Sequence, residues 1–380
     1  MGILDRWLFR EFFLSLITSL LILFGIYVTF DLLSRIDAFS TVAAQRGQWI
    51  GRTLFDYYTP QLFRFFDMTG AGLTLMAAIL AVSSLRKHNQ QTALTAAGIA
   101  PSRCFRAVFI AVVLVGIPAI LNREMVLPQF QTDLMQDITE IQSNAFARRA
   151  ISATDYARVQ FNAKGCDPEK KEIFDLSLEL PKRCLPGGGN LVHAKVALFE
   201  PATPGLPAGF RLREIVQPHG LTEGPAIQLG DRPVILTCAD FPEQLAPNEC
   251  FLVTNLIFEQ ILDQNTWSAT TDTRTLLRSI HAAPEDFGPV GRTSFHIRIL
   301  RPVSDLAVVL IGLPLIIRRR DANVFRPILI SLVVTGLCFV LNRGCQWAGN
   351  SMWLTPELAA WLPVLVMLPL TTILCCRMDA

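Results

Sequence analysis

The sequence lacks the short motifs that mark common catalytic and nucleotide-binding sites. It contains no GxxxxGKS or GxxxxGKT phosphate loop, no HExxH zinc motif and no GxSxG nucleophile elbow. The glycine run at 187–189 is not followed by a lysine, so we interpret it as a turn. The five histidines are dispersed and form no constellation with carboxylates. We therefore expect a chain that is not an enzyme and that needs no cofactor or metal.

Charged residues are also scarce and nearly balanced. They make up 17% of the chain, the formal net charge is +2, and no basic stripe with interleaved aromatic residues occurs. Nucleic-acid binding requires a basic surface, so we expect no nucleic-acid partner. Hydrophobic residues make up 51% of the chain and are gathered in blocks, which is typical of a protein with several membrane spans.

Six apolar runs are candidates for membrane helices, three before and three after a polar middle stretch. A helix of about 20 residues crosses a hydrocarbon core of about 30 Å. No small-residue cleavage site follows the first run, so we interpret it as a retained helix and not as a signal peptide. The sequence predicts an α-helical membrane protein with six transmembrane helices. The runs are 12–30, 68–85, 107–121, about 298–317, 327–342 and 358–376.

The polar stretch at 129–294 contains no window apolar enough to cross a bilayer. Within it, residues 174–180 alternate between apolar and polar, which indicates a strand with one buried face. We predict an inserted all-β domain, either a small sandwich, a jelly roll or a barrel. Similar short runs recur at 191–199, 210–216, 234–237 and 251–258. The predicted domain limits are 1–128, 129–294 and 295–380.

Basic residues determine the expected orientation. Four clusters fall at the same ends of the predicted spans. They are Arg6 with Arg10, Arg86 with Lys87, the triplet 318–320, and Arg377. Cytoplasmic segments of membrane proteins carry an excess of Lys and Arg. We therefore predict that both termini are cytoplasmic and that the inserted domain lies on the other side of the membrane.

Four of the nine cysteines lie in the inserted domain. In an oxidising compartment they can form two disulfides, and their order suggests Cys166 with Cys184 and Cys238 with Cys250. Four cysteines allow three connectivities, and buried free thiols are the alternative. No pair has the two-residue spacing of a zinc knuckle, which argues against a metal site.

Several charged residues lie near the predicted outer ends of the spans. One interpretation is that they face lipid headgroups. The other is that some of them line a cavity open to the outer leaflet, where Arg35 and Arg343 donate hydrogen bonds to an anionic headgroup. The candidate cavity residues are Asp31, Arg35, Glu124 and Arg343.

The connection at 86–106 is too long for a simple turn. Good helix formers fill 90–97, Gly98 suits a helix carboxyl cap, and Pro101 prevents continuation. We expect a short helix at the cytoplasmic surface.

Several segments together carry a specific pattern. They are 3–7 (ILDRW), 90–99 (QQTALTAAGI), 124–129 (EMVLPQ) and 298–314. In combination they resemble the LptF/LptG permeases of the lipopolysaccharide-export ABC transporter, with an LptG-like amino terminus. The resemblance covers nearly all of the membrane part, and over the inserted domain it concerns only the architecture.

This resemblance implies that two related subunits form a channel and that a separate cytoplasmic ATPase of the LptB type powers it. It implies that lipopolysaccharide or a similar lipid is extracted from the outer leaflet of the bacterial inner membrane. The inserted domain would be a periplasmic jelly roll that passes the lipid to LptC/LptA-like proteins. The residues expected to couple to the ATPase are Arg86, Gln90, Leu94, Gly98 and Ile99.

Two positions depart from the family pattern. Gln90 stands where the family has an acidic residue, and Arg35 is the basic residue nearest to Asp31, where the family has a closer one. A different class of function also fits the architecture, namely a membrane-anchored periplasmic binding or scaffold protein without transport. Co-purification with an ATPase would distinguish the two.

Overall fold

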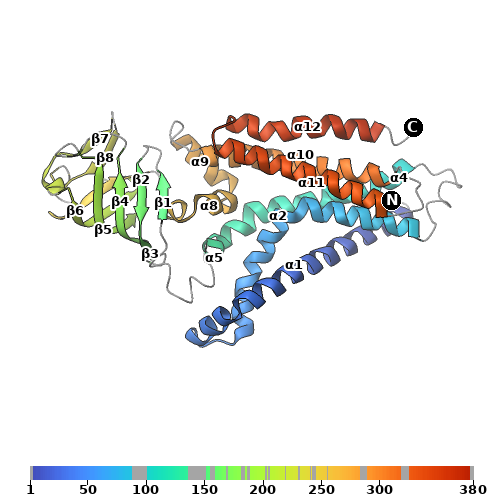
Figure 1. The fold of residues 1–380 in the computed structure, drawn as a ribbon, viewed down its shortest axis with the longest axis horizontal. Coiled ribbons are helices and arrows are strands. Elements are labelled where there is room, and N and C mark those ends of the chain that lie inside the picture. The colour runs from blue at the N-terminus through green and yellow to red at the C-terminus, as the bar shows by residue number, and fades with distance from the viewer. Residues whose placement is uncertain are drawn as a thin grey trace.

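The computed structural model is elongated, with a helical bundle at one end and a β-sheet at the other (Figure 1). The first residues of α1 and the last of α12 lie at the bundle end furthest from the sheet. The structure describes residues 3–87, 101–135, 151–154, 159–167, 170–180, 185, 189–201, 203, 206–218, 220–229, 232–239, 241, 245–254, 256–282, 289–317 and 325–376.

Long helices form the part of the chain before the sheet. They are α1 (Ile3–Gln45), α2 (Ile50–Lys87) and α4 (Pro101–Leu121). The chain continues from α4 through the π-helical turn η1 (Asn122–Val126) and the 3-10 turn η2 (Leu127–Phe130) into α5 (Gln131–Met135). The 43 residues of α1 span about 64 Å, roughly twice the thickness of a hydrocarbon core. α1 therefore extends well beyond the apolar run that the sequence indicates.

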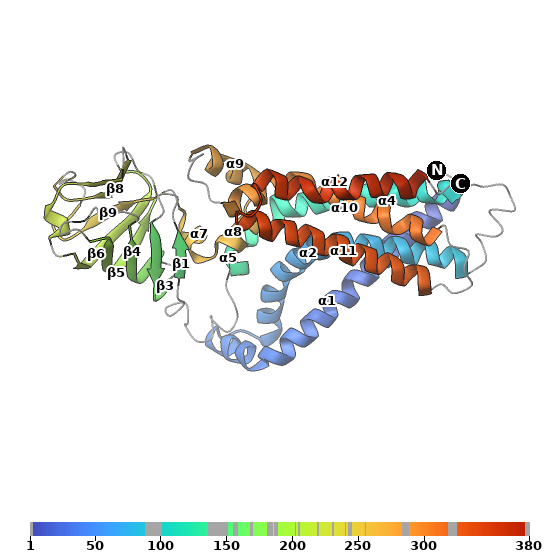
Figure 2. The ribbon, with the colours of Figure 1, turned by 45° about the horizontal axis from the view of Figure 1, so that its top comes forward.

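The α1–α2 arm, residues 36–60, leaves the bundle at an angle (Figures 1 and 2). The helix geometry of α1 is interrupted at Arg35, where φ is −131° and ψ is 19°. Beyond this kink, Phe39 stacks on Tyr58 and contacts Tyr57 edge-on. Ala38, Phe39, Val42 and Tyr58 are buried together as a small separate core. This packing explains why the polar residues after Asp31 remain helical.

The sheet is antiparallel throughout and has nine strands in the described residues, in the order β1-β2-β4-β5-β6-β9-β8-β7, with β3 paired to β4. The strands are β1 (Ile151–Thr154), β2 (Gln160–Ala163), β3 (Gly165–Asp167), β4 (Glu172–Glu179), β5 (Leu191–Glu200), β6 (Gly209–Gln217), β7 (Ile227–Leu229), β8 (Arg232–Leu236) and β9 (Cys250–Val253). An inserted all-β unit is therefore present, whereas the jelly-roll topology and the domain limits stay predictions.

The alternation in β4 shifts by one residue at Asp175. Leu176 and Leu178 are buried as predicted, but before Asp175 the buried residue is Ile173 and not Phe174. Asp175 has φ 56°, in the left-handed region that reverses the direction of the following side chains. A single residue of unusual backbone conformation therefore alters which side chains reach the core.

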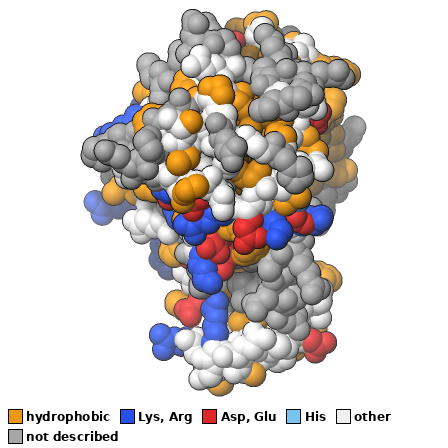
Figure 3. Space-filling model, turned by 90° about the vertical axis from the view of Figure 1, so that its left-hand side faces the viewer, with side chains coloured by type: hydrophobic (Ala, Val, Ile, Leu, Met, Phe, Trp, Pro, Cys, Tyr) orange, Lys and Arg blue, Asp and Glu red, His pale blue; other side chains and the backbone are white. Residues whose placement is uncertain are grey.

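Ion pairs connect β5, β6 and the residue that precedes β9. Arg211 donates from Nε and Nη2 to both carboxylate oxygens of Glu200, at 2.6 and 2.8 Å, and from Nη1 to Glu249 at 3.0 Å. Arg213 Nε donates to Glu249 at 2.8 Å. Figure 3, viewed from the sheet end, shows acidic and basic side chains beside one another across that face. Charges of both signs therefore neutralise each other on this surface.

Cys238 and Cys250 are both free thiols, so the structure does not contain the disulfide that was predicted between them. Cys250 is buried in the main core of the sheet together with Leu252. Cys238 packs with Phe251 and Leu245 on the other face of β9 and donates its S–H to the Leu245 carbonyl at 3.3 Å. The alternation of β9 thus separates the two thiols. Cys184 lies outside the described residues, so its pairing with Cys166 stays a prediction.

Short helices lead from the sheet back to the bundle. They are α7 (Phe258–Leu262), α8 (Gln264–Thr270) and α9 (Thr273–Ala282). The bundle is completed by α10 (Pro289–Ile317), α11 (Phe325–Asn350) and α12 (Pro356–Cys376). α10 is central, since it packs against α2, α4, α11 and α12.

Four helices in the described part of the chain are long and apolar enough to cross a membrane. They are Leu4–Gln45, Ile50–Ser84, Arg106–Met135 and Pro356–Leu374. Large apolar side chains on the outside of the bundle are exposed, for example Leu21 at 63% and Leu365 at 61%. Such side chains suit a hydrocarbon surrounding. The first, second, third and sixth predicted spans thus have the required helices, and a total of six stays a prediction.

Candidate functional site

A cavity of about 620 Å³ lies at the sheet end of the bundle, among α2, η1, α8, α10, α11 and α12. Its ionisable side chains sum to a formal charge of +3. They are Arg64, Arg123, Arg298, Arg301 and Arg343, with Asp67 and Asp305. Apolar side chains such as Met68, Val308 and Phe339 form other parts of the wall. The cavity therefore combines excess positive charge with hydrocarbon surface.

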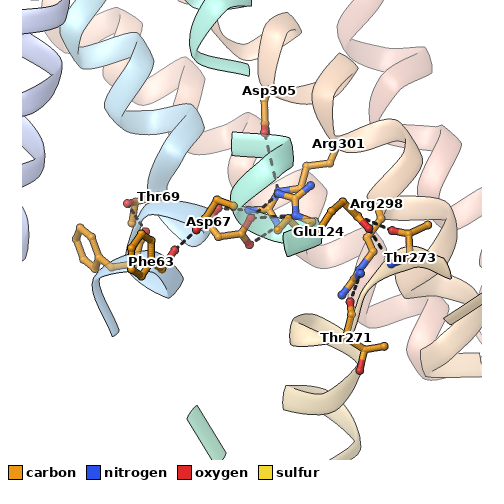
Figure 4. Close-up of polar contacts among 12 residues, drawn as sticks. Phe63, Asp67, Thr69, Glu124, Thr271, Thr273, Arg298, Arg301 and Asp305 are labelled. Atoms are coloured by element: carbon orange, nitrogen blue, oxygen red, sulfur yellow. Dashed lines mark hydrogen bonds and ion pairs between the residues drawn. The ribbon is translucent and has the colours of Figure 1, made fainter. Parts of the chain in front are cut away.

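Asp67, on α2, binds two of these arginines (Figure 4). Arg123 donates from Nε and Nη2 to Asp67 Oδ1 at 2.9 and 2.7 Å. Arg301 donates from Nη1 to Asp67 Oδ2 at 3.0 Å, and from Nη2 to the backbone carbonyl of Asp67. One carboxylate thus joins α2, η1 and α10. Charges inside a helical bundle are stabilised by such pairing with hydrogen bonds on both sides.

Arg298 connects α10 to the helices that follow the sheet. It is buried, and it donates from Nη2 to the Ser268 carbonyl at 2.8 Å and from Nη1 to the Thr271 carbonyl. These carbonyls lie at or just past the carboxyl end of α8, where backbone acceptors lack partners within the helix. Arg298 therefore holds α8 on the bundle and also adds charge to the cavity wall.

Glu124 has a different place from the one that the sequence suggested. It accepts hydrogen bonds from the backbone N–H and the hydroxyl of Thr273, at 2.9 and 2.6 Å (Figure 4). A carboxylate at this position accepts a hydrogen bond from an otherwise unpaired backbone N–H at the start of α9. Its negative charge also interacts favourably with the positive end of the helix dipole. Glu124 thus anchors α9, and it is not among the residues that line the cavity.

Asp31 and Arg35 lie together at the base of the α1–α2 arm and not in the cavity wall. Arg35 Nε is 3.3 Å from Asp31 Oδ1, and the Tyr58 hydroxyl donates to Asp31 Oδ2 at 3.0 Å. Arg343 does line the cavity. Its Nη1 donates to Gln346 at 3.2 Å, and its guanidinium lies 5.3 Å from the centre of the Phe339 ring.

The structure thus brings Arg343, of the four predicted residues, into the cavity and adds charged residues that sequence reasoning did not select. Those additions are Arg64, Asp67, Arg123, Arg298, Arg301 and Asp305. The spacing of Arg298, Arg301 and Asp305 along one predicted span was an available signal, because residues at these intervals share a helix face.

Of the predicted coupling residues, Arg86 lies in the last turn of α2. Gln90, Leu94, Gly98 and Ile99 lie outside the described residues.

The chemistry of the cavity suits an anionic amphiphile. Guanidinium groups bind phosphate or carboxylate through paired hydrogen bonds, and they do so more strongly where water is excluded. The apolar wall offers a surface for hydrocarbon chains.

The comparison with protein families identifies the chain. A model of the family described as lipopolysaccharide export system permease LptF/LptG matches residues 6–214 and 253–377. The match includes both helical parts, β1 to β5 and most of β6, and it leaves out β7, β8 and all but the last residue of β9. A search of curated proteins found no match. Because the family match covers most of the sequence, the chain belongs to the LptF/LptG family of lipopolysaccharide export system permeases.

Proposed function

We propose that this membrane permease is one subunit of an ABC transporter that extracts lipopolysaccharide, or a related anionic lipid, from the outer leaflet of the bacterial inner membrane. The observation that carries the proposal is the cavity of about 620 Å³ with its excess of arginines. The headgroup phosphates would bind the guanidinium groups, and the acyl chains would lie against apolar side chains.

Arg343 is the arginine that we expect to meet the headgroup first. Its described side-chain contacts are with Gln346 and Phe339, neither of which neutralises its charge. Arg35, paired with Asp31, would lie at the rim of the same space when α1 of one subunit faces α11 of a second permease subunit. Asp31 and Glu124 then act by holding α1 and α9 in place.

The proposed topology has six spans, both termini in the cytoplasm and the sheet in the periplasm. α10 and α11 have 29 and 26 residues, about 43 and 39 Å, which is long enough to cross a hydrocarbon core. The sheet, as a jelly roll between 129 and 294, would pass the lipid to LptC/LptA-like proteins. A cytoplasmic LptB-like ATPase would bind the segment at 86–106 through Gln90, Leu94, Gly98 and Ile99.

Lipid retention tests the function. The full-length protein is purified into nanodiscs, and its bound lipid is identified by mass spectrometry. We expect a phosphorylated lipid, with occupancy reduced about tenfold in Arg343→Gln because a charge-assisted hydrogen bond is lost. Arg213→Gln, on the sheet, is the matched control and should retain the lipid. Equal retention by Arg343→Gln and Arg301→Gln would rule out the cavity as the lipid site.

Two further observations test the transporter against the scaffold and test the proposed topology. Co-purification of an ATPase supports a transporter, and its loss in Leu94→Arg would place the contact in the segment at 86–106. Impermeant thiol labelling of single cysteines at Gln217 and Asn89 in intact spheroplasts should modify only the position on the sheet. Labelling only at position 89 would show that the topology is the reverse of the one proposed.

A further inference from the structure

We propose that Asp67 is an internal competitor for the anionic headgroup, because its carboxylate occupies the place on Arg123 and Arg301 that a lipid phosphate takes on binding. This inference rests on the proposed function. It adds a residue that lowers affinity for the lipid and so favours release.

The geometry of Asp67 is that of a bound anion. One carboxylate oxygen accepts two hydrogen bonds from Arg123, at 2.9 and 2.7 Å, and the other accepts one from Arg301, at 3.0 Å. Carboxylate and phosphate oxygens accept from guanidinium groups with similar geometry. A phosphate bridging the same two arginines would satisfy the same N–H donors. Asp67 and a headgroup therefore cannot both make these bonds.

The exposed fractions of the side chains show how a headgroup phosphate would reach Arg301 and Arg123. The Arg301 side chain is 26% exposed, whereas the Arg123 side chain is 8% exposed and that of Asp67 is 10% exposed. A phosphate in the cavity would meet Arg301 first and Arg123 behind it. Asp305, 40% exposed, lies 3.9 Å from Arg301 Nε and is a weaker second competitor.

The Asp67 carboxylate also stabilises the two arginines when the cavity holds no lipid. Two arginines inside a helical bundle are strongly unfavourable without a paired charge. Asp67 supplies that charge from α2, while Arg123 belongs to η1 and Arg301 to α10. Exchange of the carboxylate for a phosphate would remove the side-chain links of Asp67 to both elements and leave only backbone contacts such as that of Arg301 with the Asp67 carbonyl, so headgroup binding would loosen the α2 wall of the cavity.

A purely structural role for Asp67 makes a different prediction. If the carboxylate only ties three elements together, its removal lowers stability and leaves lipid affinity unchanged or weaker. If it competes, Asp67→Asn raises affinity specifically for a phosphorylated lipid. The carboxamide has nearly the same shape, and it removes the negative charge.

The experiment measures binding of two probes to the full-length protein in nanodiscs, a lipid A that carries two phosphates and the same lipid after enzymatic dephosphorylation. We expect Asp67→Asn to bind the phosphorylated probe at least about tenfold more tightly than the wild type, since close charge pairs couple by more than this factor. Asp305→Asn, the matched cavity control, should gain less. Affinity for the dephosphorylated probe should not change.

The outcomes separate this inference from the proposed function. A wild type that prefers the phosphorylated probe, with no gain in Asp67→Asn, would overturn the competitor role alone. A wild type that binds neither probe, or both equally, would overturn the anionic lipid site as well. If Asp67→Asn does not fold, hydrogen exchange of the wild type decides. The phosphorylated probe alone should speed exchange in α2 around Asp67, and unchanged exchange would refute the competition.

Discussion

Tyr58 donates its hydroxyl hydrogen to Asp31 across 27 positions of sequence and so ties α2 to α1 at the base of the arm. Asp31 also binds Arg35, the residue at which α1 is kinked. The hydrogen bond from Tyr58 to Asp31 therefore lies at the point where the arm leaves the bundle. Aromatic contacts of Phe39 and Tyr57 continue from there along the arm. The arm is thus held by its own small core and by the hydrogen bond from Tyr58 to Asp31 at its origin.

Removal of this hydrogen bond should loosen the arm. Tyr58→Phe keeps the ring in the aromatic cluster and leaves one Asp31 oxygen without its donor, at a cost of about 1 to 2 kcal/mol in local stability. Limited trypsin digestion should then cut faster after Arg46 and Arg52, which are exposed. Phe55→Leu, at a 71% exposed position, is the control and should be cut like the wild type. Equal rates for both variants would show that the hydrogen bond does not hold the arm.

Close packing of three helices at Gly349 should make this glycine sensitive to substitution. A Cβ added there would lie 2.6 Å from the Ala359 Cβ and 2.9 Å from the Thr293 Cγ2, so α10 and α12 would have to move. We expect Gly349→Ala to destabilise the bundle by about 1 to 3 kcal/mol, the usual effect of overpacking. Gly344→Ala, in the same helix with nothing within 4 Å, should be neutral. Thermal unfolding in detergent measures both, and equal melting temperatures would contradict the close contact.

The ion pairs of the sheet should make its stability depend on acid pH. Burial raises the pKa of Glu249, but hydrogen bonds from Arg211 and Arg213 outweigh this, and its pKa lies below the ordinary value of 4.5. A carboxyl whose pKa is lowered in the folded state stabilises that state, and the full stabilisation is present at pH values above the ordinary pKa. That contribution is lost as the pH falls through the lowered pKa.

Thermal unfolding of the wild type should therefore show a decrease in stability below about pH 4.5. Glu249→Gln should be less stable at neutral pH and should lose less on acidification. A wild-type slope in Glu249→Gln would show that other carboxyls dominate.

The two thiols near β9 should react at different rates. Burial, and to a smaller extent the nearby Cys238, raise the pKa of the Cys250 thiol to about 12, so almost none of it is thiolate at pH 8. A maleimide should modify partly exposed Cys238 first and Cys250 only after unfolding. Peptide mapping by mass spectrometry reads both sites. A disulfide joining them in the native protein would contradict the structure.

Local pattern was enough to predict β4, β5, β6, β8, β9 and the apolar helix cores, but it did not reveal β1, β2, β3 and β7. The run at 191–199 became β5 at 191–200, and that at 210–216 became β6 at 209–217. The run at 251–258 was too long, because β9 ends at Val253 and the chain turns into α7. The helical part of α1 beyond Asp31 was missed, since it depends on packing against α2 and not on local hydrophobicity.

The cavity depended on contacts that the linear sequence does not reveal. Asp67 and Arg301 are 234 positions apart, so no local pattern indicates that they bind each other. Glu124 was selected as a candidate cavity residue, but it binds Thr273, 149 positions away, and is not among the residues that line the cavity. Residue type and position near the end of a span indicate that a charged side chain has a specific partner. Only the fold shows which partner it is.

The π-helical turn η1 places Arg123 and Glu124 on neighbouring positions of the backbone, with Arg123 bound to Asp67 and Glu124 bound to α9. A single peptide bond therefore separates a residue of the arginine-rich cavity from the anchor of the helix that leads back from the sheet. Thermodynamic reciprocity applies to any two events that meet at such a junction. In the proposed function, a partner protein that draws α9 away from Glu124 would change the affinity for the lipid by the same factor by which the lipid changes the affinity for that partner. Binding of that partner would then favour release of the lipid through a shared coupling free energy.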